Sequence, residues 1–144
     1  MKKLIFMMCA VCTLILTGCK NNPVGDEALL IGKWQVMSCE SYSTTNSANH
    51  SEKQDVSESH ITWEFTESTA TFKLDNIETP WIYQLHRQND NTLLIEFNGL
   101  VSGEEISMTP FTIRKLTDSE MEWEYTLTGV AGPITTQEYL KKIN

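Results

Sequence analysis

Side chains that could carry out catalysis or bind a metal are few and widely separated in this sequence. The three histidines are His50, His60 and His86, and they form neither an H-x-x-H nor an H-E-x-x-H pattern. No pair of cysteines accompanies them at the spacing of a zinc site. No G-x-S-x-G segment marks a serine nucleophile. We therefore expect no metal site and no cofactor.

Two other groups have side chains suited to chemistry but are expected to be structural. Cys39 falls in an apparent strand, and no sequence signature supplies the histidine that a nucleophilic thiol needs, so a small core residue is expected. Glu122 and Glu124 could act as paired acid–base carboxylates, but both alternate with apolar residues and so face solvent. The sequence therefore predicts that the protein is not an enzyme.

The N-terminal residues follow the order of a signal peptide. Lys2-Lys3 precedes an apolar run over residues 4–16, and small residues and Cys19 follow. The run is shorter than the about 20 residues that a membrane-spanning helix needs. We therefore expect residues 1–18 to be a lipoprotein signal peptide that is absent from the mature domain.

Leu16-Thr17-Gly18-Cys19 resembles the lipobox at which bacterial lipoprotein precursors are cleaved and acylated. The resemblance implies a diacylglycerol on the sulfur of Cys19 and usually a third acyl chain on its new amino terminus. Two or three chains hold a protein stably on a membrane, whereas one chain binds only marginally. Lys20 stands where enterobacterial lipoproteins retained at the inner membrane have Asp. The expected location is therefore the cell envelope, lipid-anchored at the outer membrane, with either a periplasmic or a surface orientation.

Removal of the signal changes the thiol count and the charge. Of four cysteines only Cys39 would remain free, so no internal disulfide could form and the fold must depend on its core. The chain has 11 basic and 19 acidic residues, and loss of Lys2-Lys3 leaves 9 against 19, a net charge of −10. Nucleic acid and anionic lipid surfaces both need a basic partner surface, so we expect neither to be bound.

Residues 19–28 are predicted to be the lipidated cysteine and a flexible tether, because they contain Pro23 and Gly25 and few apolar side chains. Residues 29–144 have the size of a single domain. Apolar and polar residues alternate along them, which is typical of half-buried strands. Eight strands are predicted, at approximately 30–41, 60–66, 69–75, 81–87, 92–98, 105–115, 121–128 and 134–142.

Short polar turns link these strands, and no helical crossover separates them, so the strands should be antiparallel. A two-sheet sandwich and an up-and-down barrel both satisfy this pattern. The predicted fold class is an all-β, eight-stranded antiparallel barrel, because closure removes exposed edges. Pro110 within the sixth strand predicts a bulge or an edge position.

Gly32-Lys33-Trp34 on the first strand matches the G-x-W signature of lipocalins. Similar openings begin the small lipocalin-like lipoproteins of Bacteroidetes. The resemblance implies a calycin-like barrel in which Trp34 closes one end and a basic side chain near the last strand, Lys141 or Lys142, packs over it. Thr117-Asp118-Ser119 lies in the turn where lipocalins carry T-D-Y.

A barrel of this size can hold one small ligand or can be filled by its own side chains. In the first case the protein would be a binding protein for a small apolar or amphipathic ligand. In the second it would act through its surface, as an inhibitor or as a module for an envelope protein partner. A cavity of about 300 Å³ or more with a few convergent polar groups would favour the first. The candidate lumen residues are aromatic: Trp34, Trp63, Phe65, Phe72, Trp81, Tyr83, Phe97, Trp123 and Tyr125.

Residues 41–59 have little apolar content and are predicted to be a mobile loop. In a lipocalin-like barrel the connection between the first two strands lies over the open end. Tyr42 and Val56, its sizeable apolar residues, are therefore candidate lid residues. A solvated insertion without a role in binding is the alternative.

Overall fold

The computed structural model describes residues 25–43, 53–90, 92–101, 103–130 and 132–144. The predicted signal peptide, Cys19 and most of the predicted tether lie outside these ranges. No helix within them is long and apolar enough to span a membrane. The described elements are α1 (Asp26–Leu30), β1 (Gly32–Ser43), β2 (Gln54–Asp55), the 3-10 helix η1 (Ser57–Ser59), β3 (Thr62–Phe65), β4 (Thr69–Leu74), β5 (Ile77–Arg87), β6 (Leu93–Val101), β7 (Glu104–Ser107), β8 (Phe111–Leu116), β9 (Glu120–Gly129) and β10 (Gly132–Ile143).

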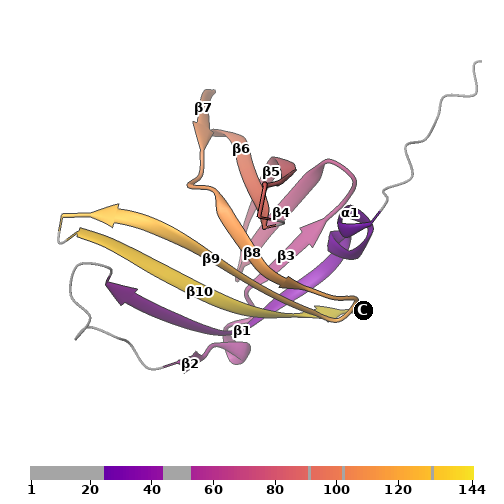
Figure 1. Ribbon diagram of the computed structural model, residues 1–144, viewed down its shortest axis with the longest axis horizontal. Coiled ribbons are helices and arrows are strands. Elements are labelled where there is room, and N and C mark those ends of the chain that lie inside the picture. The colour runs from indigo at the N-terminus through magenta and orange to yellow at the C-terminus, as the bar shows by residue number, and fades with distance from the viewer. Residues whose placement is uncertain (1–24, 44–52, 91, 102, 131) are drawn as a thin grey trace, which may run out of the picture.

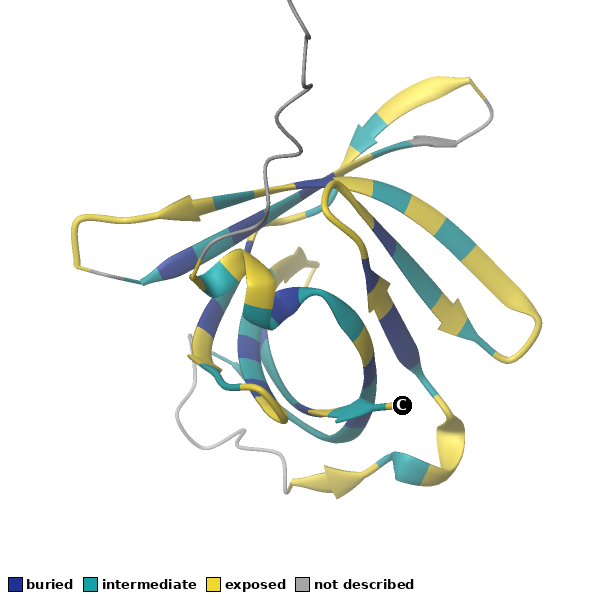
Figure 2. Cartoon of the chain, turned by 90° about the vertical axis from the view of Figure 1, so that its right-hand side faces the viewer, coloured by how far each residue is buried: buried dark blue, intermediate teal, exposed yellow. Residues whose placement is uncertain are grey.

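The strands form one antiparallel sheet that closes on itself. Hydrogen-bonded neighbours follow the order β10-β9-β8-β6-β5-β4-β3-β1, and β10 pairs again with β1. Figure 2 shows the resulting ring of strands, and Figure 1 shows the long β9–β10 hairpin that extends from it. The predicted eight-stranded antiparallel barrel is confirmed, and its architecture is consistent with a lipocalin-like barrel.

Alternation along the strands explains why the interior is apolar. On β9, Met121 and Trp123 are 1% and 0% exposed. Glu122 and Glu124, on the opposite face of the same strand, make polar contacts, and Glu124 pairs with Arg114 on β8. One face of β9 is thus removed from water, and burial of its apolar surface stabilises the fold.

The sixth predicted strand, 105–115, is two strands in the structure. β7 folds back on β6 with Ser107 opposite Asn98, whereas β8 pairs with β6 at Ile95 and Phe111. The prediction of one continuous strand is therefore wrong. The predicted bulge fits the register, because the step from Ser107 to Phe111 is one residue longer than the step from Asn98 to Ile95 on the facing strand β6. The pairing changes at residues 108–110, where Pro110 has no N–H to contribute to a ladder.

Residues 53–59 have defined structure, although they belong to the segment predicted to be a mobile loop. β2 pairs with β1, and the backbone N of Val56 donates to the carbonyl of Met37 at 3.0 Å. At the start of η1 the Ser57 backbone N donates to Asp55 Oδ1 at 2.9 Å, and this contact lowers the pKa of the Asp55 carboxyl. The loop prediction was too broad, because β1 also continues to Ser43; residues 44–52 lie outside the described residues.

One end of the barrel is closed by α1 and Trp34. The indole Nε1 of Trp34 donates to the carbonyl of Leu30 at 2.8 Å, and both residues are fully buried. Lys142 Nζ lies 4.9 Å from the centre of the Trp34 ring and donates to the carbonyls of Leu29 and Ile31 at 2.8 and 2.7 Å. Of the two lysines expected to pack over Trp34, Lys142 therefore occupies that place. Its ammonium satisfies two carbonyls that the short helix leaves unpaired.

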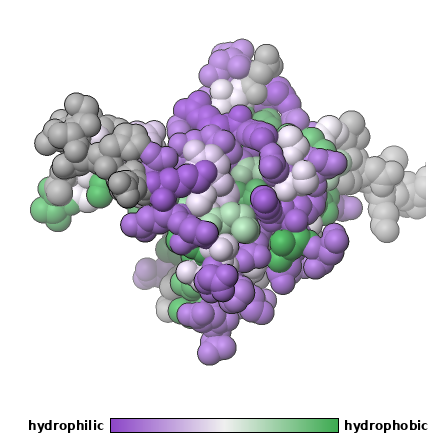
Figure 3. Space-filling view, turned by 90° about the horizontal axis from the view of Figure 1, so that it is seen from below, coloured by the Kyte–Doolittle hydropathy of each residue, from purple (hydrophilic) through white to green (hydrophobic). Residues whose placement is uncertain are grey.

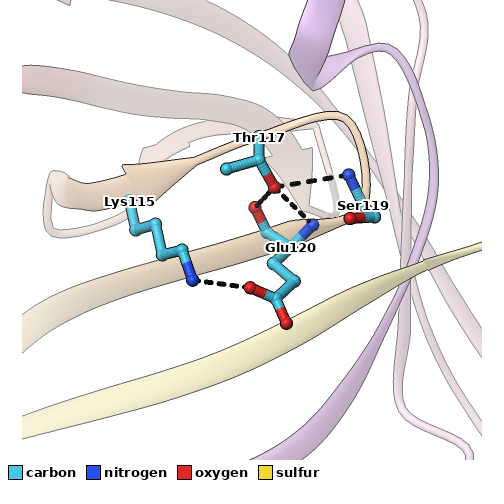
Figure 4. A network of polar contacts seen from close by, with 4 residues as sticks. All are labelled: Lys115, Thr117, Ser119 and Glu120. Atoms are coloured by element: carbon cyan, nitrogen blue, oxygen red, sulfur yellow. Dashed lines mark hydrogen bonds and ion pairs between the residues drawn. The ribbon is translucent and has the colours of Figure 1, made fainter.

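The turn between β8 and β9 lies at the same end and is held by Thr117 (Figure 4). The hydroxyl of Thr117 accepts hydrogen bonds from the backbone N of Ser119 at 3.4 Å and of Glu120 at 2.9 Å. Lys115 Nζ contacts the Glu120 carboxylate at 2.5 Å. The backbone N of Lys142 then donates to the carbonyl of Ser119 at 2.9 Å, so the turn is joined to β10 at the closed end.

Lys142→Met should lower the free energy of unfolding by about 1–3 kcal/mol. The substitution keeps the length of the side chain but leaves the Leu29 and Ile31 carbonyls without their charged donor. Lys141→Met is the matched control, since Lys141 is exposed, and should change the stability by less than about 0.5 kcal/mol. Urea unfolding followed by tryptophan fluorescence measures both. Equal losses of stability in the two variants would show that the contacts of Lys142 with Leu29 and Ile31 do not stabilise the closed end.

Candidate functional site

The middle of the barrel is filled by aromatic side chains. The ring of Trp63 lies 5.0 Å from the rings of Phe72 and Phe97 and 5.4 Å from that of Trp123, centroid to centroid. Phe65 adds contacts at 6.3 Å to Phe97 and 6.2 Å to Trp123. This cluster occupies the space that a ligand would need near the closed end. Among the cavities formed by the described residues, those beside β5–β7, beside β9–β10 and at the open end are not lined by Trp34.

A cavity of about 640 Å³ lies on the other side of this cluster, toward the barrel end opposite α1. Its wall is mainly apolar and aromatic. On the face of the molecule seen in Figure 3, much of the surface is hydrophilic, and hydrophobic side chains gather in small patches. The residues that line this cavity, called here the open-end cavity, are Ile61, Trp63, Phe72, Thr79, Trp81, Ser107, Met108, Thr109, Phe111, Tyr125, Leu127 and Glu138.

Glu138 on β10 supplies a carboxyl group to the open-end cavity. Trp123 Nε1 donates to its Oε2 at 2.8 Å, and the Tyr125 hydroxyl donates to its Oε1 at 3.1 Å. Burial raises the pKa of Glu138, although these two hydrogen bonds oppose the shift. The pKa of the Tyr125 hydroxyl is also raised, first by burial and then by the nearby Glu138 charge. Glu138 is thus a largely buried acid whose charged form is poorly solvated.

Trp81 separates the open-end cavity from a second one of about 510 Å³, which lies beside β5, β6 and β7. The Trp81 ring lies against Gly99, where an added Cβ would approach Trp81 Cε3 to 2.9 Å. Glycine at 99 therefore allows the indole to lie across the sheet. The Nε1 of Trp81 is buried and is the one such side-chain atom without a hydrogen-bond partner in the described part of the chain.

The predicted lumen residues divide into two groups. Trp63, Phe72, Trp81 and Tyr125 line the open-end cavity. The others belong to the packed core instead and are less than 9% exposed: Trp34, Phe65, Tyr83, Phe97 and Trp123.

Neither candidate lid residue lines the open-end cavity. Tyr42 is near the end of β1, opposite Thr135 of β10, and Val56 packs against the core.

Sequence reasoning missed several lining residues, above all Glu138 and Phe111. Both had a signal in the alternation of their strands. Glu138 has the same parity on β10 as the buried Leu140, and Phe111 has the same parity on β8 as the buried Ile113. Thr109 and Met108 had no such signal, because they line the cavity from the interruption between β7 and β8.

In the part of the chain that the structure describes, the other reactive side chains do not assemble into a site. Cys39, opposite Glu138 on β1, is a free thiol whose pKa is raised by burial and by the charge of Glu138. His86 contacts Glu96 at 3.5 Å on the exposed side of β5 and β6. Among the described residues, no group of three or more His, Cys, Asp and Glu side chains could hold a metal.

Comparisons of the chain with protein-family models, with curated proteins and with solved structures gave no match.

Proposed function

We propose that this protein is a lipid-anchored, lipocalin-like binding protein of the cell envelope that carries a small apolar or amphipathic molecule. The observation that carries the proposal is the open-end cavity. Its volume of about 640 Å³ falls within the about 300–1,000 Å³ of small-molecule sites. Its aromatic wall and single buried carboxyl also match the usual composition of such sites, a mainly apolar surface with a few placed polar groups.

The division of the barrel interior supports the same function. The aromatic cluster around Trp63 gives the site a rigid floor, and the walls are strands whose side chains are held by packing. A site built on strands is already formed before the ligand binds, so little ordering entropy opposes binding. A fully hollow barrel is not required for ligand binding, because the open-end cavity alone is large enough for a small molecule.

The lipid anchor expected at Cys19 would keep the cavity close to a source of apolar ligands. An anchored protein stays beside a bilayer, where apolar molecules are concentrated. Export of the domain and attachment through acyl chains therefore fit the proposed role of the cavity. We place the protein at the outer membrane on the same sequence evidence, the absence of Asp after Cys19.

A second candidate function is recognition of an envelope protein through the outer surface. The specific observation is a group of exposed apolar side chains on the β9–β10 hairpin, with Leu127, Val130 and Ile134 at 55%, 112% and 43% exposure. Leu127 also lines the open-end cavity. This surface therefore also fits a cavity entrance, and we prefer the ligand-binding function.

The binding function predicts saturable quenching of tryptophan fluorescence by a brominated apolar probe. 8-Bromooctan-1-ol is titrated into the lipoprotein held in phosphatidylcholine nanodiscs. Trp63 and Trp81 line the open-end cavity, so bromine bound there should quench their fluorescence. Thr109→Phe should weaken binding at least tenfold, since a larger ring at this lining position fills part of the cavity. Thr128→Phe, exposed on β9 and outside the lining, is the control and should bind as the unmodified protein does. Quenching that never saturates, or that is equal in the two variants, would refute the binding function.

A further inference from the structure

The charge balance around Glu138 identifies the class of ligand. The Glu138 carboxyl is held by two neutral donors, Trp123 Nε1 and the Tyr125 hydroxyl. No lysine, arginine or histidine in the described part of the chain forms an ion pair with it. A buried carboxylate without a counterion is unfavourable, so such a group either takes up a proton or is paired with a cation. No basic side chain of the described residues fills the position of that cation.

The geometry of the carboxyl leaves room for such a cation. Each oxygen of Glu138 accepts one hydrogen bond, whereas an ionised carboxylate has about four acceptor positions. The unused positions can accept N–H groups from a ligand. An ammonium group supplies up to three donors and the missing positive charge together, and charge-assisted hydrogen bonds of this kind are about twice as strong as neutral ones.

The aromatic wall favours the same chemistry. Tyr125 stacks on Phe111 with ring centroids 4.3 Å apart, and Trp63 lies 6.2 Å from Phe111. Ring faces attract cations through their quadrupoles as well as burying apolar chains. An anionic ligand would be repelled by the Glu138 carboxylate and by these negative ring faces. An acidic molecule is therefore the least suitable occupant.

We propose that the open-end cavity binds a lipophilic amine, with its ammonium group on the carboxylate of Glu138 and its apolar chain along Trp63, Phe72 and Trp81. This inference rests on the proposed binding function and narrows it to one ligand class. The amine head lies deep in the cavity and the chain extends toward Leu127 at the exposed hairpin.

Three bromoalkyl probes test the inference. 8-Bromooctan-1-amine and 8-bromooctan-1-ol have the same chain and differ in the head group, and 8-bromooctanoate supplies the anion. Each is titrated into the nanodisc-held lipoprotein, and quenching of tryptophan fluorescence measures its binding. The amine should bind at least tenfold more tightly than the alcohol, and the carboxylate should bind most weakly.

Glu138→Gln removes the charge and keeps the size of the side chain. It should abolish the tenfold advantage of the amine over the alcohol. Glu64→Gln, exposed on β3, removes one charge elsewhere and should preserve the advantage. This control separates the local carboxyl from the overall negative charge of the protein.

Lowering the pH should weaken binding of the amine more than binding of the alcohol. The pKa of Glu138 lies above the ordinary value for a glutamate, so this carboxyl takes up a proton at a higher pH than an exposed one. The other titratable groups that face it are Cys39 on β1 and Tyr125 on β9, and burial raises the pKa of both, so they stay neutral below pH 7. The alkylamine stays cationic over the same range.

The outcomes separate the two proposals. Equal binding of amine and alcohol, or equal losses of both in Glu138→Gln, would overturn the amine inference and leave the binding function in place. Failure of all three probes to give saturable quenching would overturn both.

Discussion

Trp34→Ala is expected to lower the free energy of unfolding by about 3–5 kcal/mol. The indole is 0% exposed, so its removal leaves a large cavity at the closed end. It also removes the hydrogen bond to the Leu30 carbonyl and the ring beneath Lys142. Domains of this size are stable by only about 5–15 kcal/mol, so the variant should lose a large part of its stability.

Trp34→Phe keeps an apolar ring in the same place and should lower the free energy of unfolding clearly less than Trp34→Ala does. Urea unfolding followed by circular dichroism at 218 nm measures both variants without relying on the tryptophan that is removed. A loss below about 1 kcal/mol for Trp34→Ala would contradict the role of this residue as the closure of the barrel.

Cys19→Ser is expected to abolish lipid attachment. The serine oxygen cannot replace the sulfur that would carry the diacylglycerol, so the acyl chains expected to hold the mature protein to the bilayer would be lost. The product should be soluble, mislocalised or still joined to residues 1–18. Membrane fractionation together with intact mass measurement distinguishes these forms.

Cys39→Ser is the control for that experiment. Cys39 lies on β1 within the folded domain and should have no part in acylation, so this variant should stay in the membrane fraction with its full acyl mass. A Cys19→Ser product with the same acyl mass and fractionation as the unmodified protein would refute the anchor.

The closed end of the barrel was predictable because its determinants are local or follow strand alternation. Trp34 lies in a short motif on the first strand, and the resemblance to lipocalins implied that Lys141 or Lys142, near the end of the last strand, packs over its ring. The structure selects Lys142 because its parity on β10 matches that of the inward Leu140. The short helix α1 was not predictable, because five residues carry no helical periodicity.

The binding end was harder to predict because it depends on which aromatic side chains meet one another. Alternation places Trp63 and Trp81 on inward faces, but only the closed barrel shows that Trp63 packs into a filled core on one side and faces a cavity on the other. Glu138 could have been found by extending the parity of Leu140 along β10. That no described basic residue pairs with Glu138 could not have been predicted, since this property depends on the side chains of three different strands.

The interruption between β7 and β8 shows a further limit. Pro110 indicated that the ladder was disturbed, but a bulge and a full break give the same sequence signal. The break matters for the site because it brings Met108 and Thr109 to the cavity wall.

The most direct test of the binding function is native mass spectrometry of the lipoprotein purified from its own host. The acyl chains expected on Cys19 would be covalent and would persist when the protein is denatured, whereas a cavity ligand would be lost. We predict an additional noncovalent mass in the native spectrum, identified after release as a lipophilic amine and absent from Thr109→Phe. The binding function would be contradicted if the native spectra of the unmodified protein and of Thr109→Phe were identical and showed no mass beyond that of the protein and its covalent acyl chains.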